Sequence, residues 1–195
     1  MGFSRIQTIV KSSVRGFSTA AVALAALAVV QQASAANLVT DGNFDNGFTG
    51  WSQFGNLGFT STQTGGPTGT YAHVGPVGSD GYLSQIVATQ AGSTYIFSFS
   101  VENDGGAPND FSAFLNFTPV KSYVNADPFG WTTYSDTFTA TGATLVGFSF
   151  RQDPSYYDIT GVSVSPVPLP GALALFAGGM AVLGGVGWKR RRKAS

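Results

Sequence analysis

Few residues of this sequence could carry acid–base or metal chemistry. The chain has one histidine, His73, and no cysteine, so a cysteine nucleophile, a thiolate metal site and a disulfide framework are excluded. A Ser–His–Asp triad would have to use His73, and a metal site with several histidine ligands is impossible. A lone histidine beside Tyr71 at a turn is typical of a surface or packing residue, and we favour that interpretation over a catalytic one.

The acidic residues do not single out a catalytic pair. Glycoside hydrolysis needs two carboxylates at a defined separation. The chain has ten acids, most of them next to Gly, Asn or Pro in turn-like segments, and Asp104, Asp110 and Asp127 are most simply solvated loop residues. A hydrolase with an unrecognised carboxylate pair therefore stays open as an alternative.

Aromatic residues could supply a platform on which the apolar face of a sugar ring stacks. The candidates are Trp51, Tyr82, Trp131, Tyr156 and Tyr157. For the two tryptophans, a place in the core is the commoner role. Tyr156 and Tyr157 are adjacent in a strand-like stretch, so they point to opposite faces and at most one can face a given ligand. We therefore name Trp51, Trp131 and Tyr156 as the stacking candidates.

The spacing of apolar residues predicts the elements that must hold these side chains. Two strands alternate, one with Tyr95, Phe97, Phe99 and Val101 on one face and the other with Val146, Phe148 and Phe150. Shorter candidate strands are 81–88, 111–117, 131–140 and 159–164. Clusters of Gly, Asn, Asp and Pro separate the strands, and no helical period is persuasive. We predict an all-β domain over residues 36–166, an antiparallel β-sandwich whose core is built from the inward-facing aromatic residues.

Charge is unevenly distributed along the chain. All ten acids lie between Asp41 and Asp158, where the only bases are Lys121 and Arg151. Because phosphate repels an acidic surface, the body is a poor candidate for binding nucleic acid. The remaining bases are at the two ends, a segregation that is typical of export signals and membrane topology.

The N-terminal segment has the layout of a secretory signal peptide. Residues 1–15 are polar and basic, residues 17–30 are apolar and uncharged, and Ala33-Ser34-Ala35 is a small-x-small cleavage pattern. The apolar run is shorter than the roughly 20 residues of a membrane span, which disfavours an uncleaved anchor. We expect residues 1–35 to be removed by signal peptidase after use of the export machinery.

The C-terminal segment predicts a membrane helix with a cytoplasmic end. Residues 171–188 are apolar and uncharged, and would cover roughly 27 Å as a helix. A basic tail follows: Lys189, Arg190, Arg191, Arg192 and Lys193. Such a cluster resists translocation, so the body would lie outside. Before the span, the two prolines of Val167-Pro168-Leu169-Pro170 impose an extended, accessible backbone that suits a processing enzyme.

The tail over residues 167–195 resembles the PEP-CTERM sorting signal, in a Val-Pro-Leu-Pro variant. The resemblance implies cleavage near Pro170 by a membrane-embedded exosortase of a Gram-negative bacterium. The protein would then be held in the inner membrane only transiently and pass to the cell surface or the extracellular matrix of a biofilm. This chain has Leu169 where Glu is usual and Gly171 where Ala is frequent, which leaves the sorting subclass open.

The body is similar to jelly-roll domains related to carbohydrate-binding modules. The similarity is carried by Asn37-Leu38-Val39, Gly42-Asn43-Phe44-Asp45 and Gly50-Trp51 at the start, by residues 81–85 and 92–95 in the middle, and by residues 131–138, 153–157 and 162–164 at the end. It implies polysaccharide binding and a structural calcium between the opening motif, at Asp45, and acids of the last strand, at Asp158. The last strand lacks the paired acids common there, and we expect no other cofactor.

These observations together predict an exported, non-catalytic protein of the cell surface or matrix that binds extracellular polysaccharide. Two other interpretations remain open. One is the secreted hydrolase described above, and the other is a purely structural matrix component without a small ligand.

Overall fold

The computed structural model describes residues 36–167. The predicted signal peptide and most of the predicted sorting segment lie outside these residues. Within 36–167, no helix has the length and apolar character needed to cross a membrane. The described body is built from strands and turns alone, in agreement with the predicted all-β class.

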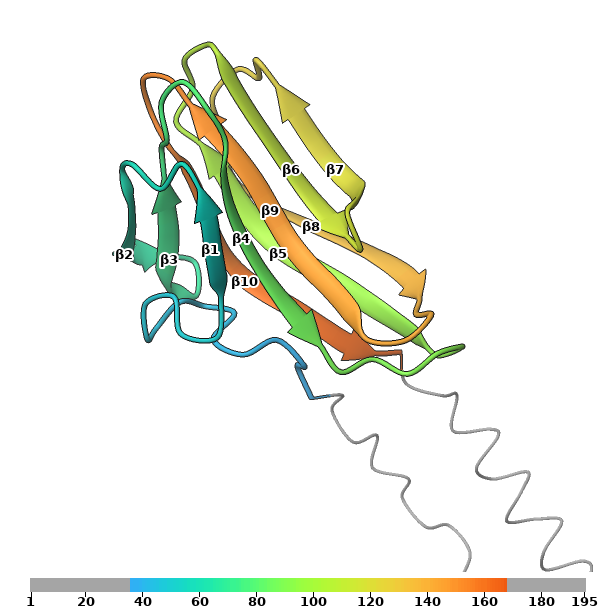
Figure 1. Ribbon diagram of the computed structural model, residues 1–195. Coiled ribbons are helices and arrows are strands. Elements are labelled where there is room, and N and C mark those ends of the chain that lie inside the picture. Colours follow the sequence, from blue (N-terminus) through green and yellow to red (C-terminus); the bar gives the residue numbers. More distant parts are fainter. Residues whose placement is uncertain (1–35, 168–195) are drawn as a thin grey trace, which may run out of the picture. The chain divides into compact units, whose positions relative to one another are not determined.

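Ten strands make up the described body. They are β1 (Ser52–Gly55), β2 (Thr60–Gly66), β3 (Gly69–Val74), β4 (Gly81–Val87), β5 (Thr94–Asn103), β6 (Asn109–Leu115), β7 (Thr118–Val124), β8 (Phe129–Thr139), β9 (Thr144–Gln152) and β10 (Tyr157–Pro166). They form two five-stranded sheets, in the orders β1-β4-β9-β6-β7 (the first sheet) and β2-β3-β10-β5-β8 (the second sheet). Neighbouring strands are antiparallel, and the sheets lie one in front of the other in Figure 1.

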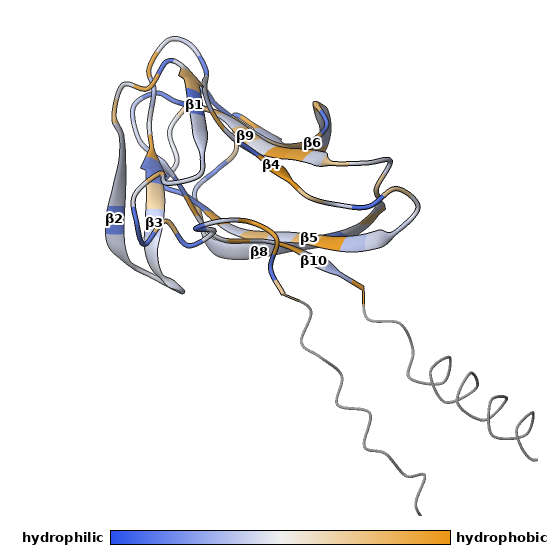
Figure 2. Cartoon of the chain, turned by 60° about the horizontal axis from the view of Figure 1, so that its bottom comes forward, coloured by the Kyte–Doolittle hydropathy of each residue, from blue (hydrophilic) through white to orange (hydrophobic). Residues whose placement is uncertain are grey.

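The core lies between the two sheets and is mainly aromatic. Along β5, buried and half-buried residues alternate, and Phe97 and Phe99 point inward. Phe148 and Phe150 do the same on β9, and the rings of Phe99 and Phe148 meet edge to face with centroids 5.2 Å apart. The predicted inward faces of both strands are thus confirmed. The two layers are visible in Figure 2, with hydrophobic stretches on β4 and β5.

Four strands were not predicted, and one predicted strand was too long. The strands β1, β2 and β7 are short and mostly exposed or half-buried, and β3 has only six residues, so none of their sequences shows a clear apolar alternation. The predicted strand 111–117 in fact ends at Leu115, because Asn116 and Phe117 form the turn to β7 with φ of 49° and 65°. Asn116 stabilises this turn, since its side-chain oxygen accepts a 2.8 Å hydrogen bond from the Leu145 amide.

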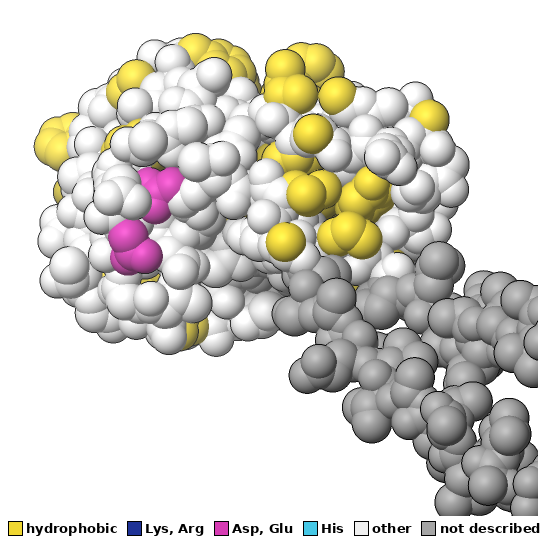
Figure 3. Space-filling view, turned by 90° about the horizontal axis from the view of Figure 1, so that it is seen from below, with side chains coloured by type: hydrophobic (Ala, Val, Ile, Leu, Met, Phe, Trp, Pro, Cys, Tyr) yellow, Lys and Arg dark blue, Asp and Glu magenta, His cyan; other side chains and the backbone are white. Residues whose placement is uncertain are grey.

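The two ends of the described body are joined by hydrogen bonds. The Asn37 side chain donates to the Val162 carbonyl and accepts from the Val164 amide, both at 3.0 Å. The Leu38 amide donates to the Val164 carbonyl at 2.8 Å. The start of the body therefore runs antiparallel to β10, and Figure 1 shows both ends on the same side of the sandwich. Figure 3 views this end, where hydrophobic side chains gather on one part of the surface.

Candidate functional site

The outer face of the first sheet carries a row of side chains that crosses all of its strands. Strand register places Phe54, Tyr82, Ser149, Ser112 and Ser122 next to one another, one residue from each strand from β1 to β7. We call these five residues the Tyr82 row. Because neighbouring strands lie about 4.8 Å apart, the row is roughly 19 Å long. It joins two aromatic rings at one end to three hydroxyl groups at the other.

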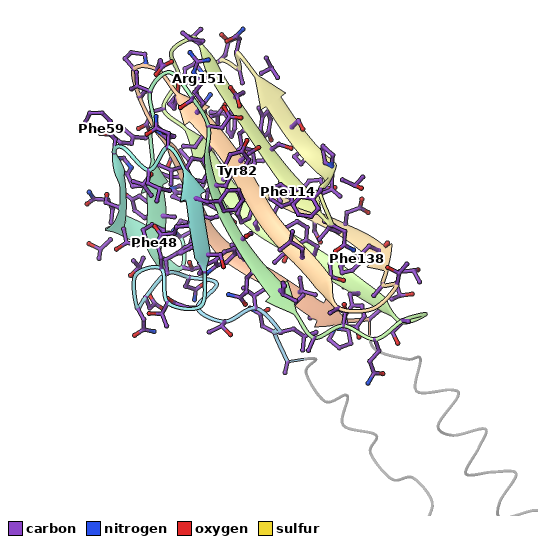
Figure 4. All side chains as sticks on the ribbon, viewed as in Figure 1. Phe48, Phe59, Tyr82, Phe114, Phe138 and Arg151 are labelled. Carbon is purple, nitrogen blue, oxygen red and sulfur yellow. The ribbon has the colours of Figure 1, made fainter. Side chains whose placement is uncertain are left out.

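The aromatic end of the row is a stacked pair. The rings of Phe54 and Tyr82 are parallel within 1°, with centroids 4.6 Å apart. Burial, followed by the charge of Asp80, raises the pKa of the Tyr82 hydroxyl above its usual value of 10.0. The hydroxyl donates to the Asp80 carboxylate at 3.4 Å. Tyr82 therefore stays neutral at ordinary pH and presents a fixed, half-buried aromatic surface on the outside of β4 (Figure 4).

The remaining positions of the row are hydroxyl groups. Ser112 and Ser122 are paired across β6 and β7, with their Oγ atoms 3.1 Å apart, and Ser149 follows on β9 next to Tyr82. Each serine hydroxyl can both donate and accept a hydrogen bond. A strip of such groups beside an aromatic ring suits a ligand that has many hydroxyls and an apolar face.

Charged residues border the row on one side. Arg151 lies two residues further along β9 than Ser149, opposite Asp110 on β6. Its guanidinium forms two hydrogen bonds with the same oxygen of Asp153, at 2.7 and 2.9 Å. Burial and the charge of Asp80 raise the pKa of Asp110, although Arg151 opposes the shift. The positive charge of Arg151 is thus largely balanced by its acidic neighbours.

Apolar residues border the row on the other side. The Phe114 ring lies over Gly147, where a Cβ atom would come within 2.5 Å of the ring. Phe117 stacks on Phe114 and is 77% exposed, and Ile86 on β4 is 72% exposed. Figure 4 shows Arg151, Tyr82 and Phe114 distributed over this face. The face thus has a charged border, a hydroxyl-bearing middle and an apolar border.

The structure separates the predicted stacking aromatics. Trp51 is only 6% exposed, and its ring packs against Phe44 and Phe148 at 5.3 and 6.1 Å. The core role that the sequence favoured for Trp51 is therefore confirmed and Trp51 is excluded as a stacking candidate, because the opening segment folds this ring inward and its indole nitrogen donates to the Asp41 carbonyl. Trp131 and Tyr156 are both half-buried. Trp131 belongs to β8 of the second sheet, and Tyr156 to the turn before β10.

Tyr156 and Tyr157 point to opposite sides, as predicted. Tyr157 is buried in the core, where its hydroxyl donates to Asn109 Oδ1 at 2.6 Å. Tyr156 instead stacks on His73, with ring centroids 3.6 Å apart.

The two predicted calcium ligands have different surroundings. Asp158 is buried on β10 and binds His73, with 2.6 Å between Oδ1 and Nδ1. Asp45 is exposed in the opening segment. Within residues 36–167, no three His, Asp or Glu side chains are grouped so as to hold a metal ion. Calcium binding remains an untested prediction.

The sorting motif begins at the edge of the described residues. Val167 is the last of them, is exposed, and its amide donates to the Thr94 carbonyl at 3.0 Å. Pro168, Leu169, Pro170 and the basic residues 189–193 lie outside the described part of the chain.

Most of the Tyr82 row was missed at the level of sequence. Tyr82 was among the aromatic candidates, but Phe54 and the three serines were not. The sequence held one indication of the row. Ser149 lies between Phe148 and Phe150, which face inward, so Ser149 must face outward. Only the register between strands shows that these residues lie in one row.

Comparison with known proteins identifies the family. Residues 36–152 match the model of a family described as a carbohydrate binding domain. The chain belongs to this carbohydrate-binding family. A search of curated proteins gave no match.

Several solved structures share the fold at 14% identity, which shows the fold alone. TmCBM61, solved in complex with beta-1,4-galactotriose, superposes with a TM-score of 0.52 over 68% of this chain and 100% of its own. The C-terminal family 22 carbohydrate binding module of Clostridium thermocellum Xyn10B gives 0.50 over 69% and 96%. The enzymatically active domain of Bacteriophage CBA120 tailspike protein 4 gives 0.55, and the match covers 67% of this chain but only 21% of the tailspike chain.

Proposed function

We propose that this protein binds a neutral extracellular polysaccharide along the Tyr82 row and does not hydrolyse it. The observation that carries the proposal is the row itself, in which a stacked aromatic pair and three serine hydroxyls lie in line across one sheet. Membership in a carbohydrate-binding family supports the same function.

The chemistry of the face fits a sugar chain. The Tyr82 ring stacks on the apolar face of one sugar unit, and the serine hydroxyls exchange hydrogen bonds with the hydroxyls of the units that follow. A row of roughly 19 Å is long enough for several units in line. The ligand is neutral because Arg151 is already paired with Asp153, and Asp110 and Asp80 would repel an anionic polymer.

The test of binding is a comparison of two aromatic variants of the full chain. Tyr82→Ala should weaken binding to neutral oligosaccharides about tenfold, or about 1.4 kcal/mol, measured by isothermal titration calorimetry. The matched control is Phe59→Ala, which removes a ring that is 67% exposed at the edge of β2, away from the row (Figure 4). Equal affinity of Tyr82→Ala and the wild type would refute the site. Release of reducing ends from the bound polysaccharide would refute the non-catalytic role.

The proposal extends to where the protein acts. The chain is exported, loses residues 1–35 to signal peptidase, and is held in the inner membrane by residues 171–188 until an exosortase cuts near Pro170 and passes it to the cell surface. The exposed position of Val167 at the end of β10 supports access to the motif that begins there. The tail Lys189–Lys193 stays in the cytoplasm until cleavage.

Three measurements test export and processing. An alkaline-phosphatase fusion after Pro166 should be active, and an inactive fusion would contradict the proposed topology. Replacing both Pro168 and Pro170 with Ala should leave a larger, membrane-retained form. Mass spectrometry of the protein from its native host should find no peptide containing Trp188; such a peptide in the mature protein would rule out removal of the tail.

A further inference from the structure

A second group of aromatic side chains lies on the outer face of the second sheet, which the Tyr82 row does not use. Trp131 on β8 contacts Tyr71 on β3 edge to face, with centroids 5.5 Å apart. Tyr71 is 6.1 Å from His73, and His73 stacks on Tyr156 at 3.6 Å and 17°. The four rings thus form a continuous line of contacts from β8 to the turn before β10. All four are half-buried, so part of each is available to a ligand.

Carboxylates accompany these rings. Strand register places Asp158 on β10 between His73 on β3 and Glu102 on β5. Asp158 is buried and bound to His73, whereas Glu102 is half-exposed and Asp104 follows exposed at the end of β5. Burial raises the pKa of Tyr71, and the charges of Asp158, Asp104 and Glu102 raise it further. The carboxylates are therefore close enough to make the aromatic surface electrically negative.

No lysine or arginine offsets this charge within the described part of the second sheet. The lysine and arginine between residues 36 and 167 are Lys121 and Arg151, which belong to β7 and β9 of the first sheet, and His73 is bound to Asp158. Aromatic faces attract cations, and carboxylates accept hydrogen bonds from ammonium groups. Neutral hydroxyls are also present on this face, where Ser100 and Thr133 are hydrogen-bonded at 2.9 Å. The surface thus combines rings, carboxylates and hydroxyls.

We propose that Tyr71, His73, Trp131, Tyr156 and Glu102 form a second carbohydrate site, specific for a glycan with free amino groups such as a polymer of glucosamine. The rings pack on the apolar faces of the sugar units, and Glu102 accepts a hydrogen bond from a sugar ammonium. The site lies on the opposite sheet from the Tyr82 row and does not depend on it.

The test is the affinity of the full chain for two oligosaccharides that differ only in acetylation. At low salt, hexamers of glucosamine should bind at least tenfold more tightly than hexamers of N-acetylglucosamine, measured by calorimetry. Glu102→Gln keeps the shape of the side chain and should abolish most of this preference. Trp131→Ala should weaken binding of the glucosamine hexamer about tenfold. Raising the salt should reduce the preference, because it screens the interaction between charges.

Control variants distinguish binding at this second site from binding at the Tyr82 row. Tyr82→Ala should leave glucosamine-hexamer affinity unchanged, and Trp131→Ala should leave neutral-oligosaccharide binding by the Tyr82 row unchanged. Equal affinity for the two hexamers, or an unaltered preference in Glu102→Gln, would overturn the proposal. If Trp131→Ala fails to fold, Glu102→Gln still tests the proposal. Glu102 lies on the outer side of the sheet, so we expect its replacement to leave the core intact.

Discussion

The two outer faces of the sandwich are made from the same kind of strand but carry different chemistry. The first has an aromatic pair followed by serines, with Lys121 and Arg151 on its strands. The second has four linked rings, that of His73 included, around a buried carboxylate, with acids but no lysine or arginine in the described strands. The inward faces are alike, since phenylalanines fill the core from both sheets. The core residues therefore specify the fold, while the outward positions are free to differ between the two faces, for each of which we propose a different ligand.

The largest expected effect comes from the core that both faces share. Phe148 contacts the rings of Trp51, Phe97, Phe99 and Phe111 from the centre of the first sheet. Phe148→Ala should lower stability by about 3–5 kcal/mol, because lost transfer energy and a cavity add together. Thermal unfolding should show a large drop, and both ligands should be lost at the same temperature.

The control for the core variant is Phe117→Ala, which removes a ring that is 77% exposed and should hardly move the melting temperature. Loss of one ligand well below the temperature at which the other is lost would show that the sheets do not unfold together.

A second variant should affect the first face alone. In Gly147→Ala, the new Cβ would lie 2.5 Å from the Phe114 ring and 2.7 Å from the Leu83 carbonyl oxygen. We expect a cost of about 1–3 kcal/mol from overpacking, together with weaker binding of neutral glycans, since Phe114 must move beside the row. Gly130→Ala is the control, because its Cβ would meet nothing closer than 3.9 Å. If Gly147→Ala weakened glucosamine binding as much as neutral-glycan binding, the expectation that it affects the first face alone would be contradicted.

The second face should be distinguished by its response to pH. Burial raises the pKa of Asp158 to about 6 from its usual 3.8, although the hydrogen bond and charge of His73 oppose the shift. Nearby Asp104 and Glu102 add to it, and Tyr71 and Tyr156 lie beside the His73 ring. The folded state thus keeps the Asp158 proton to a higher pH than the unfolded state. This contribution to stability is fully present below about pH 4 and is lost as pH rises through about 6.

Asp158→Asn should remove that dependence. We compare the melting temperatures of the wild type and of Asp158→Asn at each pH. The difference, wild type minus variant, should fall by several degrees between pH 4 and pH 7. Asp127→Asn, in an exposed turn, should follow the wild-type profile. If the melting temperatures of Asp158→Asn and the wild type changed with pH in the same way, burial would not raise the pKa of Asp158 as described.

The smallest effect should come from the charged border of the first face. Arg151 is half-exposed and already pairs with Asp153, and solvent-exposed ion pairs of this kind contribute little. Arg151→Gln should therefore change neutral-glycan affinity by less than about twofold. A tenfold loss, measured by the same calorimetry as for Tyr82→Ala, would mean that the guanidinium contacts the ligand directly.

The sequence was sufficient for the β class and the core but not for the sites. Alternation in residues 95–101 and 146–150 reports directly which side chains face inward. A site on a sheet depends instead on register between strands that are far apart in the chain. His73 and Asp158 are 85 residues apart and meet only because β3 pairs with β10. The sequence left Trp51 open between the core and a stacking surface, because its burial depends on the fold of the opening turn.

The adjacency of the two ends of the body has a mechanical consequence. The segment from Asn37 runs antiparallel to β10 and is held to it by hydrogen bonds at Val162 and Val164. Tension applied between Asn37 and Val167 would load these bonds one after another, as a zipper opens, rather than all together in shear. We expect single-molecule pulling from these two positions to release the first segment at low force. Tension applied through ligands on the two faces would instead pull the sheets apart across the aromatic core, and that direction should resist a higher force.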